Sequence, residues 1–153
     1  MSRTSQRRLS AGCVALTLVG AAVTWSAVPA QAATTSVAVS EVYGGGGNAG
    51  ATYTHDFIEL YNLGDAPVDL ATWSVEYYSA TGSTASATAL AGTLAPKSSY
   101  LVQLAAGAGG STALPGPDAT GSTAVSASAG RVLLRDGART VDAVAYGSAA
   151  TPV

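Results

Sequence analysis

The block from residue 56 to residue 78 constrains the fold more than any other stretch of this sequence. Residues 56–62, Asp-Phe-Ile-Glu-Leu-Tyr-Asn, are rich in the aromatic and β-branched types that suit the half-buried surface of a β-sheet. Gly64 and Pro67 then end the strand, because glycine permits unusual backbone angles and proline cannot donate to a sheet ladder. A second aromatic stretch follows at 73–78. The block predicts two strands joined by a turn, with a core around them.

Shorter runs of the same kind occur along the rest of the chain, at 37–43, 100–104, 131–135 and 140–146. Segments rich in Ser, Thr, Ala, Gly and Pro separate them and predict loops, with room for a weak edge strand within 79–89 and a short strand within 122–129. No convincing amphipathic helix occurs after residue 32. Many short strands between such turns predict an all-β sandwich or barrel.

An Asp-Gly pair between the last two strands predicts a hairpin. Pairing Leu134 with Val141, and Val132 with Ala143, would place apolar residues together on one face. This register needs a four-residue loop, 136–139, in place of the two-residue loop that Asp-Gly first suggests. We therefore expect the four-residue loop.

The first segment of the chain has the pattern of a secretory signal peptide. Three arginines precede residue 9, an apolar run at 11–23 is too short to span a bilayer comfortably, and Ala30-Gln31-Ala32 supplies a cleavage site. We expect residues 1–32 to be removed and residues 33–153 to form the secreted domain. The Arg7-Arg8 pair leaves twin-arginine export as an alternative to general secretory export.

Removal of this segment changes the inventory of side chains. The sole cysteine, Cys13, leaves with it, so the domain is expected to hold together by packing without a disulfide. Four basic residues remain against nine acidic ones, a net charge of −5. An acidic domain is a poor general binder of nucleic acid, whose phosphates require a basic surface. No later apolar run is long enough to span a membrane.

The blocks at 56–62, 68–70 and 73–75 resemble the signature of the lamin-tail domain family, and of its secreted bacterial members in particular. The similarity covers roughly 37–147 and includes four further blocks, at 39–48, 94–96, 100–102 and 141–147. The resemblance implies an immunoglobulin-like β-sandwich over residues 33–153. Domains of this family usually continue past the last block, so we expect the domain to be truncated at its C-terminal edge or the chain to be a fragment.

His55, Asp56 and Glu59 are the first candidates for a metal or acid–base cluster. On a strand, however, Asp56 and Glu59 point to opposite faces. The structural interpretation is therefore favoured, in which Asp56 binds a loop amide and Glu59 faces solvent or is paired internally. A serine nucleophile would have to recruit His55, the sole histidine, and no Gly-x-Ser-x-Gly elbow is present. The sequence thus predicts no catalytic residue.

The glycine run 44–47 follows a strand, as phosphate-binding loops do. It lacks the Gly-Lys-Ser/Thr ending and a following helix, so it is interpreted as a permissive loop. Four other carboxylates are scattered without EF-hand spacing, at Glu41, Asp65, Asp69 and Asp118. No cofactor and no metal are predicted, although a calcium site built from loops stays open.

The residues predicted to contact a ligand lie on two strands and a turn. Trp73, Val75 and Tyr77 share the core face of one strand, which leaves Tyr78 on the surface, where its ring could stack on a sugar. Two arginines share a face of the 131–135 strand and a third lies in the next turn. This stripe could bind an anionic polymer, although most such stripes are solvated strand faces. The predicted surface consists of Tyr78, Arg131, Arg135 and Arg139.

The favoured function is a secreted, non-catalytic module for binding or adhesion. Its partner would be an unknown extracellular ligand, either a polymer or a cell-surface component. The resemblance supplies an alternative, because such bacterial domains often accompany secreted hydrolases: the chain would be the N-terminal accessory domain of a nuclease or phosphatase-type enzyme. A third reading is a surface protein that associates only with itself. The downstream reading frame and the size of the protein in solution discriminate among these three.

Overall fold

The computed structural model describes residues 37–149, and the predicted signal peptide lies outside them. Every element in this part of the chain is a β-strand. The strands are β1 (Val37–Tyr43), β2 (His55–Asn62), β3 (Val68–Asp69), β4 (Trp73–Ser79), β5 (Ser86–Ala89), β6 (Thr93–Leu94), β7 (Ser99–Ala106), β8 (Ala119–Thr120), β9 (Gly130–Asp136) and β10 (Arg139–Tyr146). No helix in the described range is long and apolar enough to cross a membrane.

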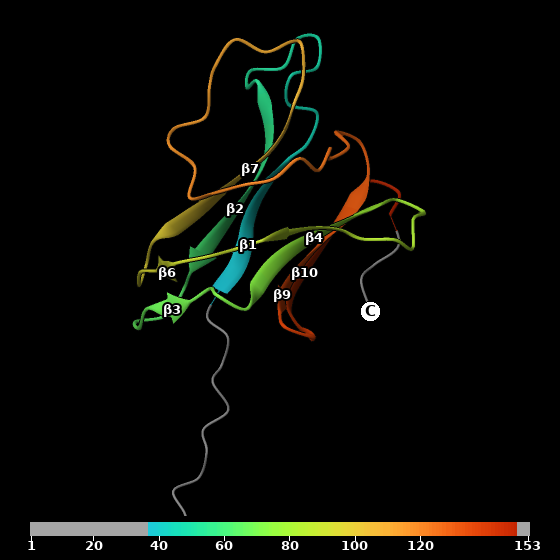
Figure 1. Cartoon of the computed structure of the whole chain (residues 1–153). Helices are drawn as coiled ribbons and strands as arrows, with labels where there is room; N and C mark the ends of the chain where they lie inside the picture. Colours follow the sequence, from blue (N-terminus) through green and yellow to red (C-terminus); the bar gives the residue numbers. More distant parts are fainter. Residues whose placement is uncertain (1–36, 150–153) are drawn as a thin grey trace, which may run out of the picture. The chain divides into compact units, whose positions relative to one another are not determined.

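Two four-stranded sheets form the domain (Figure 1). One has the order β1-β2-β7-β8 and the other β10-β9-β4-β5, while β3 and β6 form a small separate ladder. All strand pairs are antiparallel except β7 with β8. The architecture confirms the predicted all-β, immunoglobulin-like sandwich.

The core lies between the inner faces of the two larger sheets, because alternate residues of each strand point inward. Trp73 is 6% exposed, and Val75 and Tyr77 are buried beside it, so the predicted core face of β4 is confirmed. The largest fully buried apolar side chains come from both sheets and their connections: Ile58, Leu60, Leu70, Leu94, Val102, Val132 and Leu134.

The edge strands β1 and β10, one from each sheet, contact each other. Each of these strands has an irregularity in its register, at Ser40 in β1 and at Val141 in β10. Asp142 lies next to the second irregularity, and its Oδ2 accepts a hydrogen bond of 2.8 Å from the backbone N–H of Val39. Bulged edges resist pairing with other chains, and this bond ties the two edges to each other.

The expected register of the last hairpin was wrong by one residue. Leu134 pairs with Asp142, and Val132 with Val144, so the loop contains only Gly137 and Ala138. The irregularity at Val141 absorbs one residue of β10 and shifts the ladder. Gly137, the first of the two loop residues, has a φ of 53°, and glycine at this position is typical of the tight type II′ hairpin turn.

Of the two short strands predicted within the loop segments, the structure contains one. The weak edge strand within 79–89 is confirmed as β5. The prediction of a short strand within 122–129 was wrong, because this segment crosses from one sheet to the other without regular secondary structure. Its backbone makes single hydrogen bonds and no continuous β-ladder. The carbonyl of Thr123 accepts from the N–H of Ala105, and the carbonyl of Val125 accepts from the N–H of Gly45.

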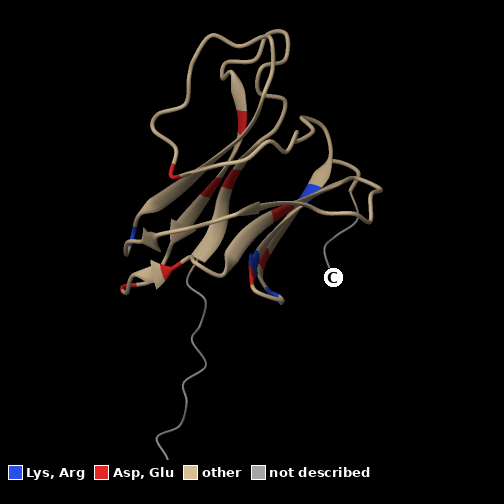
Figure 2. Cartoon of the chain, in the orientation of Figure 1, with Lys and Arg blue, Asp and Glu red and all other residues tan. Residues whose placement is uncertain are grey.

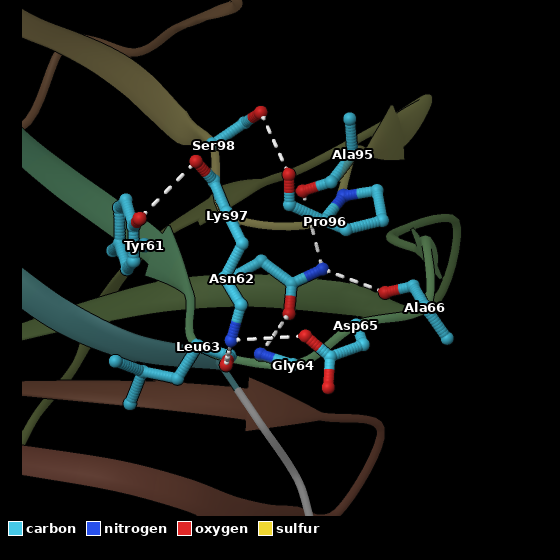
Figure 3. A network of polar contacts seen from close by, with 10 residues as sticks. All are labelled: Tyr61, Asn62, Leu63, Gly64, Asp65, Ala66, Ala95, Pro96, Lys97 and Ser98. Atoms are coloured by element: carbon cyan, nitrogen blue, oxygen red, sulfur yellow. Dashed lines mark hydrogen bonds and ion pairs between the residues drawn. The ribbon is translucent and has the colours of Figure 1, made fainter.

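A polar network closes the end of the sandwich at which β2 ends (Figure 3). Asn62 is fully buried, and its Nδ2 donates to the carbonyls of Ala66 and Ala95 at 2.9 and 3.2 Å. Lys97, which has a φ of 54°, forms an ion pair of 3.1 Å with Asp65. The network fastens the turn after β2 to the turn before β7, an organising role for Asn62 that the sequence did not indicate.

Candidate functional site

Asp56 serves the structure of the loops at one end of the sandwich. The side chain is 4% exposed, and each carboxylate oxygen accepts one backbone hydrogen bond. Oδ1 accepts from Gly46 at 2.6 Å, and Oδ2 accepts from Val125 at 2.7 Å. The structural interpretation of Asp56 is therefore confirmed, with two amides bound in place of one.

The other members of the proposed acid–base cluster have separate partners. His55 Nδ1 lies 2.9 Å from Thr54 Oγ1, and Glu59 Oε1 accepts a hydrogen bond of 2.8 Å from Ser40 Oγ. Among residues 37–149 no group of three His, Cys, Asp or Glu side chains is placed to hold a metal ion. The structure does not bring His55, Asp56 and Glu59 together around one point.

The glycine run after β1 is packed against other backbone. A Cβ atom added at Gly46 would lie 2.0 Å from the carbonyl carbon of His55, so no larger residue fits there. The N–H groups of Gly45, Gly46 and Gly47 donate to Val125 O, Asp56 Oδ1 and Tyr53 O. These amides are therefore committed inside the domain, which supports the interpretation of the run as a permissive loop.

The predicted ligand surface lies on the outer face of β4 and β9. Tyr78 and Arg131 are directly opposite in the ladder, and the guanidinium carbon lies 5.0 Å from the centre of the Tyr78 ring. This distance places the cation within the range of a cation–π contact. The guanidinium also donates to the carbonyl of Gly82 at 2.6 Å. Two contacts, with the Tyr78 ring and with the Gly82 carbonyl, therefore hold Arg131 in place.

Glu76 joins the tyrosine to the second arginine of this surface. The Tyr78 hydroxyl donates to Glu76 Oε2 at 3.0 Å, and Arg135 Nε lies 3.7 Å from the same oxygen. The second separation is an ion pair and too long for a hydrogen bond, in agreement with the unpartnered state of that Nε atom. The hydrogen bond to Glu76, followed by burial, raises the pKa of Tyr78 above its ordinary value.

The third arginine lies at the far end of the same hairpin. Arg139 is exposed and stands opposite Asp136 in the ladder, beside the turn. The structure thus links Tyr78 and Arg135 through Glu76, with Arg131 against the Tyr78 ring. Arg139 is not part of this row, because the register places it on the face opposite to Arg135. Charged residues are sparse over the whole domain, and Figure 2 shows the loops at the top of the view almost without them.

A second candidate, on the outer face of the other sheet, was not predicted from the sequence as a site. Phe57 stacks on Tyr43 with ring centres 5.1 Å apart, and Tyr53 meets both rings edge-on. Phe57 is only 6% exposed although it points away from the core. A hollow of about 150 Å³ lies beside these rings, lined by Glu41, Tyr53, Phe57, Glu59, Leu101, Leu114 and Pro115. We call it the aromatic–acid hollow.

The register of β1 against β2 is what brings the residues of this hollow together. Glu41 stands directly opposite Glu59 in the observed register, and Tyr43 opposite Phe57. In the sequence Glu41 was one of several scattered acids, and its partner becomes visible only after the two strands are aligned. A larger hollow of about 280 Å³ lies between the edges of β1 and β10, lined by Val39, Ser40, Glu41, Val42, Gly44, Ala127, Val144 and Tyr146.

Comparison with known proteins supports the resemblance noted in the sequence. The family model of the lamin tail domain matches residues 30–148, which is most of the chain and all but one of the described residues. No curated protein sequence matches the chain. The family is therefore established by the match to its model together with the observed β-sandwich.

Proposed function

Because the chain belongs to the lamin tail domain family, we propose that it acts as a secreted, non-catalytic binding module. The observation that carries the proposal is the stacked pair of Tyr78 and Arg131, in one row with Arg135 on the outer face of a sheet. This row offers an aromatic plane and two cations to a ligand. The commitment of both Asp56 oxygens to backbone amides supports the non-catalytic part.

The ligand that suits this row is an anionic extracellular polymer. Arginine binds anionic groups through a planar fork of donors, and an adjacent ring adds a stacking surface for sugars. Glu76 partly neutralises the row through its contact with Arg135. Binding is therefore expected to be weak and to decrease as salt screens the charges.

The direct experiment measures binding of a sulfated polysaccharide, dextran sulfate, to the purified protein at low and moderate salt. Arg131→Gln should weaken binding by about fivefold, because one cation and its stacking contact are lost. Lys97→Gln is the matched control, since it removes the same charge from the turn before β7, outside the sheet that carries this row. Equal weakening in both variants would show a response to net charge alone and would contradict the assignment of this face.

Secretion has its own test, which does not depend on the ligand. The predicted signal peptide ends at Ala32, so exported protein should begin at Ala33. Intact-mass analysis of protein recovered from the culture medium measures this end directly. An N-terminus before Gln31, or retention of the whole chain inside the cell, would contradict the secreted form of the proposal.

A further inference from the structure

We propose that the aromatic–acid hollow receives a basic side chain, a lysine or arginine presented by a partner protein. The proposal goes beyond the anionic-polymer surface, because the hollow lies on the other sheet and selects the opposite charge. Three features of the hollow lead to it: its size, its unbalanced charge and the composition of its walls.

The size of the hollow admits one side chain. Its volume of about 150 Å³ corresponds to about five water molecules, at about 30 Å³ each in the liquid. One wall is the loop segment at Leu114 and Pro115. Nearby backbone pins this loop, because Tyr53 bridges to Thr112 and the N–H of Thr54 donates to Thr112 O at 3.0 Å. The wall is therefore held in place without a ligand.

The charge of the hollow lacks a counter-ion within the described part of the chain. Glu41 and Glu59 face each other across β1 and β2, an arrangement of like charges that destabilises a strand pair. Neither carboxylate takes part in the ion pairs between Lys97 and Asp65 or between Arg135 and Glu76. A cation supplied by a partner protein would balance these two carboxylates.

The walls suit the stem of a long basic side chain. Lysine and arginine bury an apolar stem while the charged head stays near polar groups, so they match an apolar hollow with carboxylates at its side. Leu101 and Leu114 offer apolar surface to the stem. The partly exposed ring of Tyr53 adds attraction for a cation placed over its face within about 6 Å of its centre.

Two other occupants fit less well. A divalent metal ion prefers six or more oxygen ligands, and no group of three candidate side chains exists among the described residues. A neutral sugar could stack on the aromatic rings, but it would leave the negative charge of the two opposed carboxylates without a counter-charge. The observed combination of two acids with an apolar, aromatic wall therefore favours an organic cation on a flexible stem.

The test uses the purified protein, processed at its predicted cleavage site, and a blocked tetralysine peptide as the probe. Binding is followed by chemical-shift changes in a titration at low salt. Glu41→Gln with Glu59→Gln should weaken binding about tenfold, since two charge contacts are lost while the shape is kept. Asp65→Asn, an exposed acid in the turn after β2, is the matched control and should change binding less than twofold.

A second readout separates binding from folding. The double Glu→Gln variant should be at least as stable as the wild type, because it removes the repulsion between opposed acids. Tyr53→Leu should weaken tetralysine binding and leave that of dextran sulfate unchanged, whereas Arg131→Gln should do the reverse. Equal loss of tetralysine binding in Asp65→Asn, shifts that map away from the hollow, or saturation of the same residues by Ca²⁺ alone would each overturn the proposal.

Discussion

Asp56 links parts of the chain that are far apart in sequence. Its carboxylate binds Gly46, ten residues before it, and Val125, 69 residues after it. Because the side chain is buried, its removal would leave two amides without partners inside the domain. A single residue therefore holds the glycine loop against the segment that crosses between the sheets.

We predict that Asp56→Ala lowers the free energy of unfolding by about 3 kcal/mol or more, because two hydrogen bonds to a charged group are lost. Asp56→Asn should lose less, since the amide keeps one acceptor oxygen. Urea unfolding followed by fluorescence measures both values. Ser40→Ala, which removes a bond between exposed side chains, serves as the control. An Asp56→Ala midpoint equal to that of the control would show that the buried bonds contribute little.

At the scale of elements, β4 connects the core to the predicted ligand surface. Trp73, Val75 and Tyr77 fill the inside of the sandwich, and Tyr78 points outward beside Arg131. Because side chains alternate along a strand, the core residues that fix β4 in the sandwich also fix the position of Tyr78 on its outer face. Loss of the inner packing would also disturb the row that we assign to the ligand.

Trp73→Ala is expected to destabilise the protein by about 3–5 kcal/mol, the usual effect of emptying a large aromatic site in a core. The variant should be unfolded or should melt at a much lower denaturant concentration. Leu63→Ala is the control, because Leu63 is 58% exposed. If the midpoint of Trp73→Ala equalled that of wild type, the tryptophan would have to be a surface group.

The sequence predicted those features of the structure that depend on the alternation of side chains along a single strand. The faces of β4, the two strands of the block at 56–78 and the opposite directions of Asp56 and Glu59 follow from a period of two. The hairpin register and the aromatic–acid hollow did not follow, because both depend on pairs of strands. The irregularity at Val141 accompanies the hydrogen bond that the Val39 N–H donates to Asp142, 103 residues away. No local pattern contains that information.

At the scale of the whole molecule, Tyr146 ties the end of β10 to the segment that crosses between the sheets. Its hydroxyl donates to the carbonyl of Ser126 at 2.6 Å. Burial, with a smaller effect from the neighbouring Tyr77, raises the pKa of Tyr146 far above its ordinary value. The folded domain therefore strongly favours the neutral phenol.

This shift predicts a loss of stability in alkaline solution. Above a pH of about 10 the unfolded chain loses the Tyr146 proton while the folded chain keeps it, so the free energy of unfolding decreases as the pH rises further. Below that pH the contribution is fully present. Urea midpoints between pH 8 and pH 11 should fall steeply in the wild type and less steeply in Tyr146→Phe. Identical slopes would contradict the assignment to Tyr146.

The central claim is that this domain binds without catalysing a reaction, and a turnover assay tests it most directly. Purified protein is incubated with DNA, RNA and a generic phosphate ester, with Mg²⁺ and Ca²⁺ supplied. We predict no turnover above the buffer control. Turnover that follows the protein through purification and disappears in His55→Ala would contradict the account and would favour a hydrolase.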